Sequence, residues 1–400
     1  MDPLKISEDI YWVGAVDWNI RDFHGYSTYA GTTYNAYLIL DDHVTLIDTV
    51  KKEFADELLA KVSKVIDPKR IDYVVSNHTE MDHSGGLARV MHKIGEDKPV
   101  YCSIMGHKNL SKHFPQPWNY KPVKSADELS LGRRTLTFLE TRMLHWPDSM
   151  FSYVKEDRIL FSSDAFGQHY AGLERFDDEI GEAIMPHAKK YFANILLLYA
   201  DRILKLAEQV TEMGLQLDMI CPDHGIMWRK DPAKIINAYV EWARQAPTRK
   251  ALVVYDTMWH STEAMAEAIV EALGRQGVDA CPMHLRKWHR SDIMTEVLDA
   301  GAVIVGSPTI NNGLFPTVSD FLTYMKGLKP KNKVGAAFGS YGWSGEAVKL
   351  INRELEAMRF SLVDPGLRVQ YVPTEQSLQA CHDLGDKIAR ALPADTRGPR

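Results

Sequence analysis

The chain has 400 residues, of which 45% are hydrophobic and 25% charged, a composition typical of a soluble globular protein with two domains. Its formal net charge is -6 and no basic block stands out, which argues against a nucleic-acid partner. No apolar run approaches the roughly 20 residues of a membrane span, and the first residues lack the apolar core of a signal peptide. We therefore expect a cytoplasmic protein that binds neither nucleic acid nor a membrane.

The four cysteines, Cys102, Cys221, Cys281 and Cys381, lie far apart and form no C-x-x-C pair. This spacing encodes neither a disulfide framework nor a cysteine-held iron site. Any iron bound by this chain must therefore be held by nitrogen and oxygen.

The N-terminal part mixes short strands, turns and a few helices. Apolar runs predict strands at residues 11–14, 35–40, 44–48, 71–75, 158–161 and 219–221, with a hairpin turn at Asp41-Asp42. Helical periodicity is present at residues 53–66 and, more strongly, at 188–213.

The polar, proline-containing segment 245–250 reads as a linker, and beyond it strands and helices alternate regularly. Strands are predicted at residues 251–255, 302–306 and 333–338, and helices at 262–273, 318–326, 346–358 and 375–391. This alternation predicts a doubly wound parallel sheet. We place the two domains at residues 1–247 and 248–400.

The run His78-Thr79-Glu80-Met81-Asp82-His83 directly follows the predicted strand 71–75 and supplies four metal-binding side chains within six positions. Loops at the carboxyl ends of strands are where open α/β sheets place their chemistry. Such a dense set of ligand types is improbable as a chance loop, so we interpret it as part of a two-metal site.

Three further ligand types, His145, Asp164 and His224, each follow a predicted strand. Taken alone, a histidine there is more often an ordinary polar residue, and Asp164 is more often a turn or helix cap. They gain weight because the first cluster by itself cannot enclose two ions. Asp48, at another strand end, is interpreted either as a carboxylate that orients a metal-bound histidine or as a cap of the following turn.

The C-terminal part carries three loops rich in glycine, hydroxyl and aromatic residues, each directly after a strand. A helix N-terminus with hydroxyl groups suits a single phosphate. Without G-x-G-x-x-G or G-K-[ST], a mononucleotide fits better than a dinucleotide or a nucleoside triphosphate. The candidate cofactor-binding residues are Thr257, Met258, Trp259, His260, Ser261, Thr262, Ser307, Pro308, Thr309, Ile310, Asn311, Asn312, Ser340, Tyr341, Gly342, Trp343 and Ser344.

The order H-x-E-x-D-H, His145, Asp164, His224 resembles the metallo-β-lactamase superfamily, whose hydrolases carry H-x-H-x-D-H. With glutamate at position 80 and a flavodoxin-like second domain, the whole chain resembles the flavodiiron proteins. The resemblance implies an N-terminal metallo-β-lactamase-like αββα sandwich, a C-terminal flavodoxin-like doubly wound parallel sheet, two non-haem iron ions and FMN.

The resemblance also implies the role of each ligand. One iron is held by His78, Glu80 and His145, the other by Asp82 and His224, with His83 as an additional candidate, and Asp164 bridges the two. In related proteins the loop around His24 and Tyr26 approaches the diiron pocket, so we expect these two residues to assist Glu80 and Asp164 in catalysis. A mixed nitrogen and carboxylate set favours iron over zinc.

By resemblance, the reaction is four-electron reduction of O2 to water, two-electron reduction of NO to N2O, or both. No rubredoxin or NAD(P)H-oxidoreductase module follows the second domain, so we expect a separate donor such as rubredoxin. The family also implies a head-to-tail homodimer or a dimer of dimers. Two other classes share part of this pattern: a zinc hydrolase, against which Glu80 and the flavin loops count, and a non-enzymatic electron-transfer or gas-sensing protein.

Overall fold

The computed structural model describes residues 2–212 and 214–394, and the chain divides into two units that are described separately below. The N-terminal unit comprises Met1–His24, Thr28–Phe192 and Tyr199–Val240. The C-terminal unit comprises Gly25–Ser27, Ala193–Leu198 and Glu241–Arg400. Within the described residues, none of the helices combines the length and apolarity needed to cross a lipid bilayer.

Two sheets stack face to face in the N-terminal unit. The seven-stranded sheet has the order β1 (Leu4–Ser7), β2 (Ile10–Trp12), β7 (Tyr37–Ile39), β8 (Val44–Ile47), β9 (Ile71–Ser76), β10 (Pro99–Ser103) and β11 (Asn119–Val123). The five-stranded sheet has the order β12 (Glu128–Ser130), β13 (Thr135–Glu140), β14 (Met150–Val154), β15 (Ile159–Phe161) and β16 (Met219–Cys221). Two short ribbons pair β3 (Ala15–Asp17) with β6 (Thr32–Tyr34) and β4 (Asp22–Phe23) with β5 (Tyr26–Ser27).

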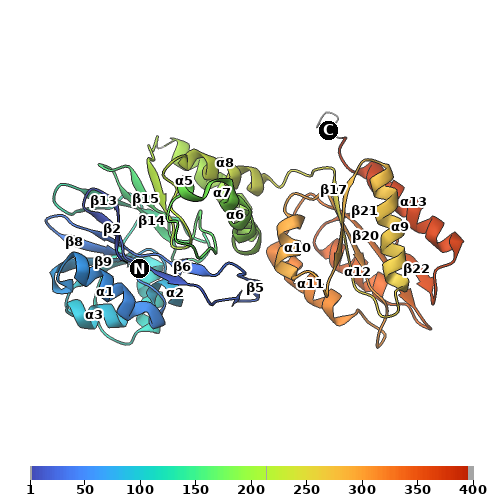
Figure 1. Cartoon of the computed structure of the whole chain (residues 1–400), viewed down its shortest axis with the longest axis horizontal. Helices are drawn as coiled ribbons and strands as arrows, with labels where there is room; N and C mark the ends of the chain where they lie inside the picture. The colour runs from blue at the N-terminus through green and yellow to red at the C-terminus, as the bar shows by residue number, and fades with distance from the viewer. Residues whose placement is uncertain (1, 213, 395–400) are drawn as a thin grey trace. The chain divides into compact units, whose positions relative to one another are not determined.

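Helices cover the outer faces of both sheets (Figure 1). On the side of the seven-stranded sheet lie α1 (Ala55–Val65), α2 (Met81–Ser84), α3 (Leu87–Ile94) and α4 (Ile104–His113). On the side of the five-stranded sheet lie α5 (Asp177–Ile180), α6 (Met185–Tyr191), α7 (Ala200–Glu212) and α8 (Pro232–Arg244). These layers confirm the predicted αββα sandwich.

The central strands are apolar on both faces because each face is covered. Leu46 and Val74 pack with Leu58 of α1 in one hydrophobic cluster, between sheet and helices. Their chain neighbours Ile47 and Val75 belong to a second cluster, between the two sheets. Successive side chains of a strand point to opposite faces, so one strand contributes to both cores and leaves its end rigidly placed.

The C-terminal unit is a parallel sheet of the order β18 (Asp279–His284), β17 (Lys250–Tyr255), β19 (Ala302–Gly306), β20 (Val334–Tyr341) and β21 (Ser361–Leu362), with β22 (Leu367–Gln370) also paired to β20. All of these neighbours run parallel. In chain order this is the 2-1-3-4-5 arrangement of flavodoxin-like sheets, which confirms the predicted doubly wound fold.

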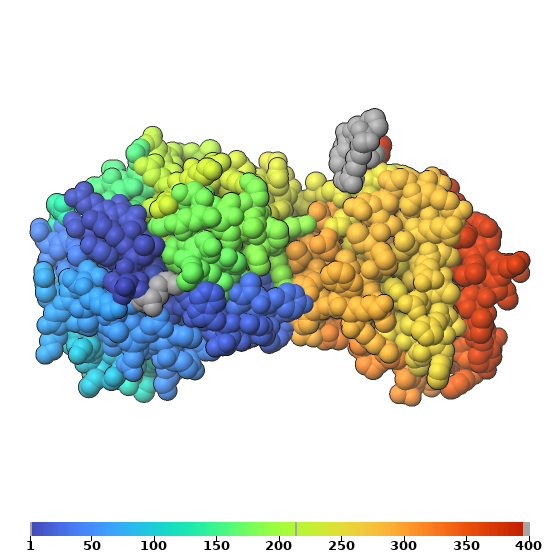
Figure 2. Space-filling view, in the orientation of Figure 1, coloured from blue at the N-terminus to red at the C-terminus, as the bar shows by residue number. Residues whose placement is uncertain are grey.

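Helices lie on both faces of this sheet. One face carries α9 (Ser261–Arg275) and α13 (Glu375–Ala391), which are side by side (Figure 1), and their gold and red surfaces adjoin in the space-filling view (Figure 2). The other face carries α10 (Arg290–Val297), α11 (Pro316–Leu328) and α12 (Ala347–Ala357). The loops that follow β17, β19 and β20 therefore emerge at one edge, since the three strands are adjacent and parallel.

One predicted helix differs from the structure. Residues 188–213 are not one helix: α6 ends at Tyr191, a π-helical turn spans Phe192–Leu196, a 3-10 turn spans Leu197–Tyr199, and α7 then begins at Ala200. Met213 lies outside the described residues. Apolar periodicity alone cannot reveal such a break, because a π turn inserts a residue without changing which residue types are used.

Candidate metal centre and cofactor pocket

Seven side chains predicted as ligands converge in the N-terminal unit. His78 and Glu80 lie in the loop after β9, Asp82 and His83 lie in α2, and the other three follow the β-strands of the five-stranded sheet. The potential ligand atoms form two groups within which they lie no more than 4.8 Å apart: His78, Glu80, His145 and Asp164 in one, and Asp82, His83 and His224 in the other.

The carboxylate of Asp164 lies between these groups. Its Oδ2 is 3.1 Å from Nε2 of His145 and 3.4 Å from Nε2 of His78. Its Oδ1 is 3.1 Å from Nε2 of His83 and 3.5 Å from Nε2 of His224. Each oxygen thus faces one group, which is the arrangement that a bridging carboxylate requires.

Each half of the cluster contains another carboxylate. Oε2 of Glu80 is 3.3 Å from Nε2 of His78 and 3.1 Å from Nε2 of His145. The Asp82 carboxylate is 3.2 Å from Nε2 of His224 and 3.4 Å from Nε2 of His83. All four imidazoles therefore direct the same ring nitrogen, Nε2, toward carboxylate oxygens.

Two of the histidines are oriented by hydrogen bonds from the opposite ring nitrogen. Nδ1 of His78 donates to Oδ2 of Asp148 at 3.0 Å, and the same oxygen accepts from the backbone N–H and the hydroxyl of Thr79. Nδ1 of His224 donates to the backbone carbonyl of Thr33 at 2.7 Å. These bonds select the tautomer that leaves Nε2 free of its proton, as a metal ligand needs.

The sequence did not reveal which carboxylate orients a ligand. Asp48, the predicted candidate, instead accepts hydrogen bonds from the backbone N–H and side-chain amide of Asn77, at 2.7 and 2.8 Å. Asp148 takes that position, three residues after His145 and fully buried. The only sequence signal was a carboxylate within the predicted ligand loop. Tyr191, whose hydroxyl donates to Oδ1 of Asp164 at 3.0 Å, was also not predicted.

His24 and Tyr26, the two other residues expected at this centre, differ in their exposure and in the unit to which they belong. Nε2 of His24 is 3.2 Å from Oε1 of Glu80, although 73% of the His24 side chain is exposed. Tyr26 is buried, and it is grouped with the C-terminal unit rather than with the unit that holds the cluster.

The electrostatics of the cluster fit bound cations. Burial would raise the pKa of Asp164, but His83 and the hydrogen bond from His145 hold this pKa well below its ordinary value. Both oxygens of Asp82 are buried, and neither accepts a hydrogen bond of ordinary geometry from any described residue. A buried carboxylate without such a partner is costly unless a cation compensates it. Two divalent ions, held by these seven residues, would supply that charge.

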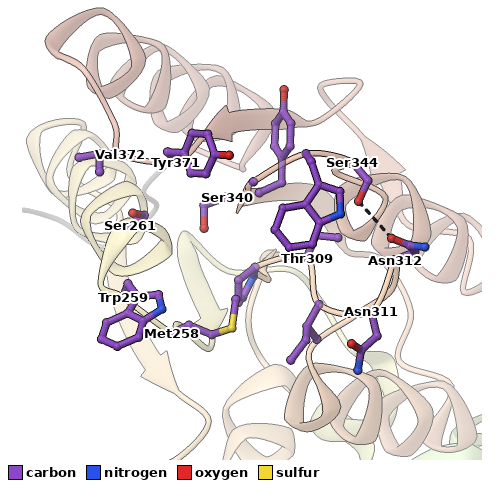
Figure 3. Close-up of a pocket in the computed structure, with 15 residues that line it drawn as sticks. Met258, Trp259, Ser261, Thr309, Asn311, Asn312, Ser340, Ser344, Tyr371 and Val372 are labelled. Atoms are coloured by element: carbon purple, nitrogen blue, oxygen red, sulfur yellow. Dashed lines mark hydrogen bonds between the residues drawn. The ribbon is translucent and has the colours of Figure 1, made fainter.

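The predicted cofactor loops line a pocket of about 500 Å³ in the C-terminal unit (Figure 3). Thirteen of the seventeen predicted residues line it: Met258, Trp259, Ser261, Pro308, Thr309, Ile310, Asn311, Asn312, Ser340, Tyr341, Gly342, Trp343 and Ser344. Thr257, His260, Thr262 and Ser307 are not among the lining residues. The pocket size is that of a small-molecule cofactor site.

Two residues of this pocket were not predicted, Tyr371 and Val372. They follow β22, whose neighbour β20 ends in the third loop, so strand pairing brings them to the pocket: the backbone N–H of Tyr371 donates to the carbonyl of Tyr341 at 2.8 Å. Both are exposed, as are Trp259 and Trp343, each at 87%. A flat aromatic cofactor would cover several of these apolar side chains.

Hydroxyl groups near the start of α9, beside the residues that line the pocket, are suited to the phosphate of a mononucleotide. The hydroxyl of Thr257 is buried and makes no hydrogen bond to any described residue. It lies just before α9, which begins at Ser261, and the hydroxyl of Thr262 is 2.8 Å from that of Ser340. Hydroxyls at the N-terminus of a long helix are the donors that a phosphate requires.

Comparisons with known proteins agree with this geometry. Residues 32–225 match the family described as ODP family beta lactamase, and residues 253–385 match flavodoxin. The chain is 49% identical over 395 residues to a nitric oxide reductase of Moorella thermoacetica, covering 98% of this chain and 99% of that protein.

Two solved structures share the fold over nearly the whole chain. Rubredoxin oxygen:oxidoreductase from Desulfovibrio gigas has a TM-score of 0.96 and 45% identity, with 98% of each chain covered. The flavodiiron protein from Giardia intestinalis has a TM-score of 0.94 and 34% identity, covering 98% of this chain and 96% of that one. A metallo-β-lactamase-type sandwich with a two-metal ligand set, joined to a flavodoxin domain, defines an oxidoreductase that uses iron and flavin. The chain belongs to the flavodiiron protein family.

Replacement of Asp148 by alanine is expected to weaken iron binding about 10- to 100-fold, because the His78 imidazole loses the acceptor that orients it. Iron retention against a competing chelator measures this effect. Asp56→Ala, which removes an exposed carboxylate paired with Arg89, is the matched control and should retain iron normally. Equal iron retention in the two variants would contradict the assigned role of Asp148.

Replacement of Thr257 by valine is expected to raise the dissociation constant for FMN about tenfold, because a hydrogen bond to a charged phosphate is lost without a change of shape. Titration of the flavin-free protein with FMN, followed by fluorescence quenching, measures it. Thr323→Val is the control, since the hydrogen bond that this hydroxyl donates, to the carbonyl of Ser319, lies within α11. If both variants bind FMN like the wild type, Thr257 is no phosphate ligand.

Proposed function

We propose that this protein reduces O2 to water, NO to N2O, or both, at a non-haem diiron site, with electrons passed through FMN from an external donor such as rubredoxin. The observation that carries the proposal is the combination, in one chain, of a buried ligand set containing three carboxylates with a mononucleotide pocket. Iron, unlike zinc, can change its oxidation state and transfer electrons to a bound gas. The nitric oxide reductase and the rubredoxin oxygen:oxidoreductase to which the chain is similar support both reactions.

The proposed ligands follow the two groups of the cluster. His78, Glu80 and His145 would hold one iron, Asp82, His83 and His224 would hold the other, and Asp164, which faces both groups, would be shared between them. The inward Nε2 of His83, 3.1 Å from Asp164, supports its inclusion. Around the ions, His24 is near enough to Glu80 to exchange a proton with it, and the Tyr191 hydroxyl holds the bridging carboxylate in place. A catalytic role is also proposed for Tyr26, and it is supported only by the position of Tyr26 in the same β4–β5 hairpin as His24.

FMN is proposed to bind the seventeen predicted loop residues together with Tyr371 and Val372. The phosphate would accept hydrogen bonds from Thr257 and the N-terminus of α9, while Trp259 and Trp343 cover the ring. The boundary between the two domains is proposed to lie between residues 247 and 248. The protein is further proposed to be cytoplasmic. It is also proposed to form a head-to-tail homodimer or a dimer of dimers, and sedimentation analysis distinguishes both oligomers from a monomer.

Steady-state assays with reduced rubredoxin and each gas in turn test the proposed reaction. We expect consumption of O2, of NO, or of both, accompanied by reoxidation of the flavin. Metal analysis and the visible spectrum of the same sample should show iron and FMN. Zinc without flavin absorbance, combined with hydrolysis of a thioester or a β-lactam, would refute the proposal in favour of a hydrolase.

Replacement of Glu80 by histidine tests the selection of iron. The variant should lose iron, favour zinc and stop reducing gas while FMN stays bound, because the substitution restores an imidazole-rich ligand set. Metal content, flavin content and turnover are the measurements. Glu53→His, at an exposed position of the same unit, is the control. Two retained irons with normal turnover in Glu80→His would show that Glu80 does not select the metal.

A further inference from the structure

A second cavity, of about 520 Å³, is lined only by residues of the N-terminal unit, among them residues of helices α7 and α8 and of the five-stranded sheet. Helix α7 contributes Ile203 and Ala207, helix α8 contributes Ile236, and the strands contribute Phe151 and Leu160. None of the site residues described above lines it. It is therefore distinct from the metal cluster and from the flavin pocket.

The cavity runs from the surface to the interior of the unit. At one end its lining residues are exposed, namely Thr211, Ala233 and Asn237. At the other end they are buried: Leu144 is 3% exposed and Tyr239 is 2% exposed. The lining thus extends from exposed residues of α7 and α8 to buried residues next to the loops that carry metal-ligand candidates.

The buried end is built on the same loops that carry two metal ligands. Leu144 directly precedes His145, and Phe166 follows Asp164 by two residues. The Tyr239 hydroxyl accepts a hydrogen bond from the backbone N–H of Phe166 at 2.7 Å, and the two rings pack with centroids 4.7 Å apart. A molecule at this end is therefore separated from the ligand loops by the Leu144, Phe166 and Tyr239 side chains.

The chemistry of the walls selects a neutral apolar ligand. None of the described lining residues is an acid, a lysine, an arginine or a histidine, and the Tyr239 hydroxyl is engaged with Phe166. Apolar walls offer water few hydrogen bonds, and apolar cavities bind small apolar molecules such as xenon. A fatty acid is disfavoured, since no cation is present among the described lining residues to hold its carboxylate.

We propose that this cavity is the entry and holding site for the diatomic gas, concentrating O2 or NO beside the loops of His145 and Asp164. The identity of the gas rests on the proposed function, whereas the existence of an apolar ligand site is independent of it. Both gases are neutral, small and apolar, so the same walls accept either.

Xenon binding and gas kinetics on the iron- and FMN-loaded protein test the proposal. Crystals pressurised with xenon should show it in this cavity in the wild type, and Ala207→Trp should remove it by filling the space. In the same variant the KM for the gas should rise about threefold or more with kcat nearly unchanged, because delivery is slowed while the chemistry is not. Reduction of the flavin by rubredoxin and iron content should stay at wild-type values.

Glu208→Trp, which adds the same ring on the exposed side of α7, is the matched control and should change neither xenon binding nor KM. Ile236→Phe, from the opposite wall, replaces Ala207→Trp if that variant does not fold. No xenon in the wild-type cavity, or an unchanged KM in a variant whose cavity is filled, would overturn the proposal. A wild type that binds xenon here but reduces neither gas would instead refute the proposed function.

Discussion

Three carboxylates and four imidazoles share one buried volume in this protein, and the rest of the N-terminal unit depends on that arrangement. Burying carboxylates is favourable only when positive charge lies among them. Their hydrogen bonds to histidine supply part of it, while Asp82 has none of ordinary geometry within the described chain. The fold thus holds together a charge distribution that metal ions complete, which is why binding and stability should be linked here.

The strands of the seven-stranded sheet fix the positions from which the ligand-bearing loops start. Because β8 and β9 contribute alternate side chains to two separate cores, their ends can shift little, and the loop after β9 starts from a fixed point. Further positioning comes from hydrogen bonds to groups outside the candidate ligand set: Asp148 holds His78, the Thr33 carbonyl holds His224, and Tyr191 holds Asp164. Tyr191 is the last residue of α6, directly before the π turn, so the interruption of the helix coincides with a hydrogen bond to the Asp164 carboxylate.

The flavin pocket differs from the metal cluster in its exposure and in the lack of charged side chains among its described lining residues. Its tryptophans are exposed, and the polar side chains that line it carry hydroxyls and amides rather than charges. Such a surface gains apolar contact when a planar ring covers it, and it needs no buried counter-charge. The metal site is therefore built inside a core, whereas the pocket is built at the open edge of a sheet.

The sequence by itself indicated the candidate ligand residues, the three loops of the C-terminal unit and the strands they follow, because these signals are local: adjacent ligand types, small residues after strands, and apolar periodicity. It predicted no strand at β18, an edge strand that contains Pro282, nor at β10, β11 or β14, and it missed the break after Tyr191. Only the tertiary structure showed that Asp148 rather than Asp48 orients His78, and that Tyr371 reaches the pocket through the pairing of β22 with β20. These outcomes depend on distances between segments remote in the chain, which packing sets and residue order does not.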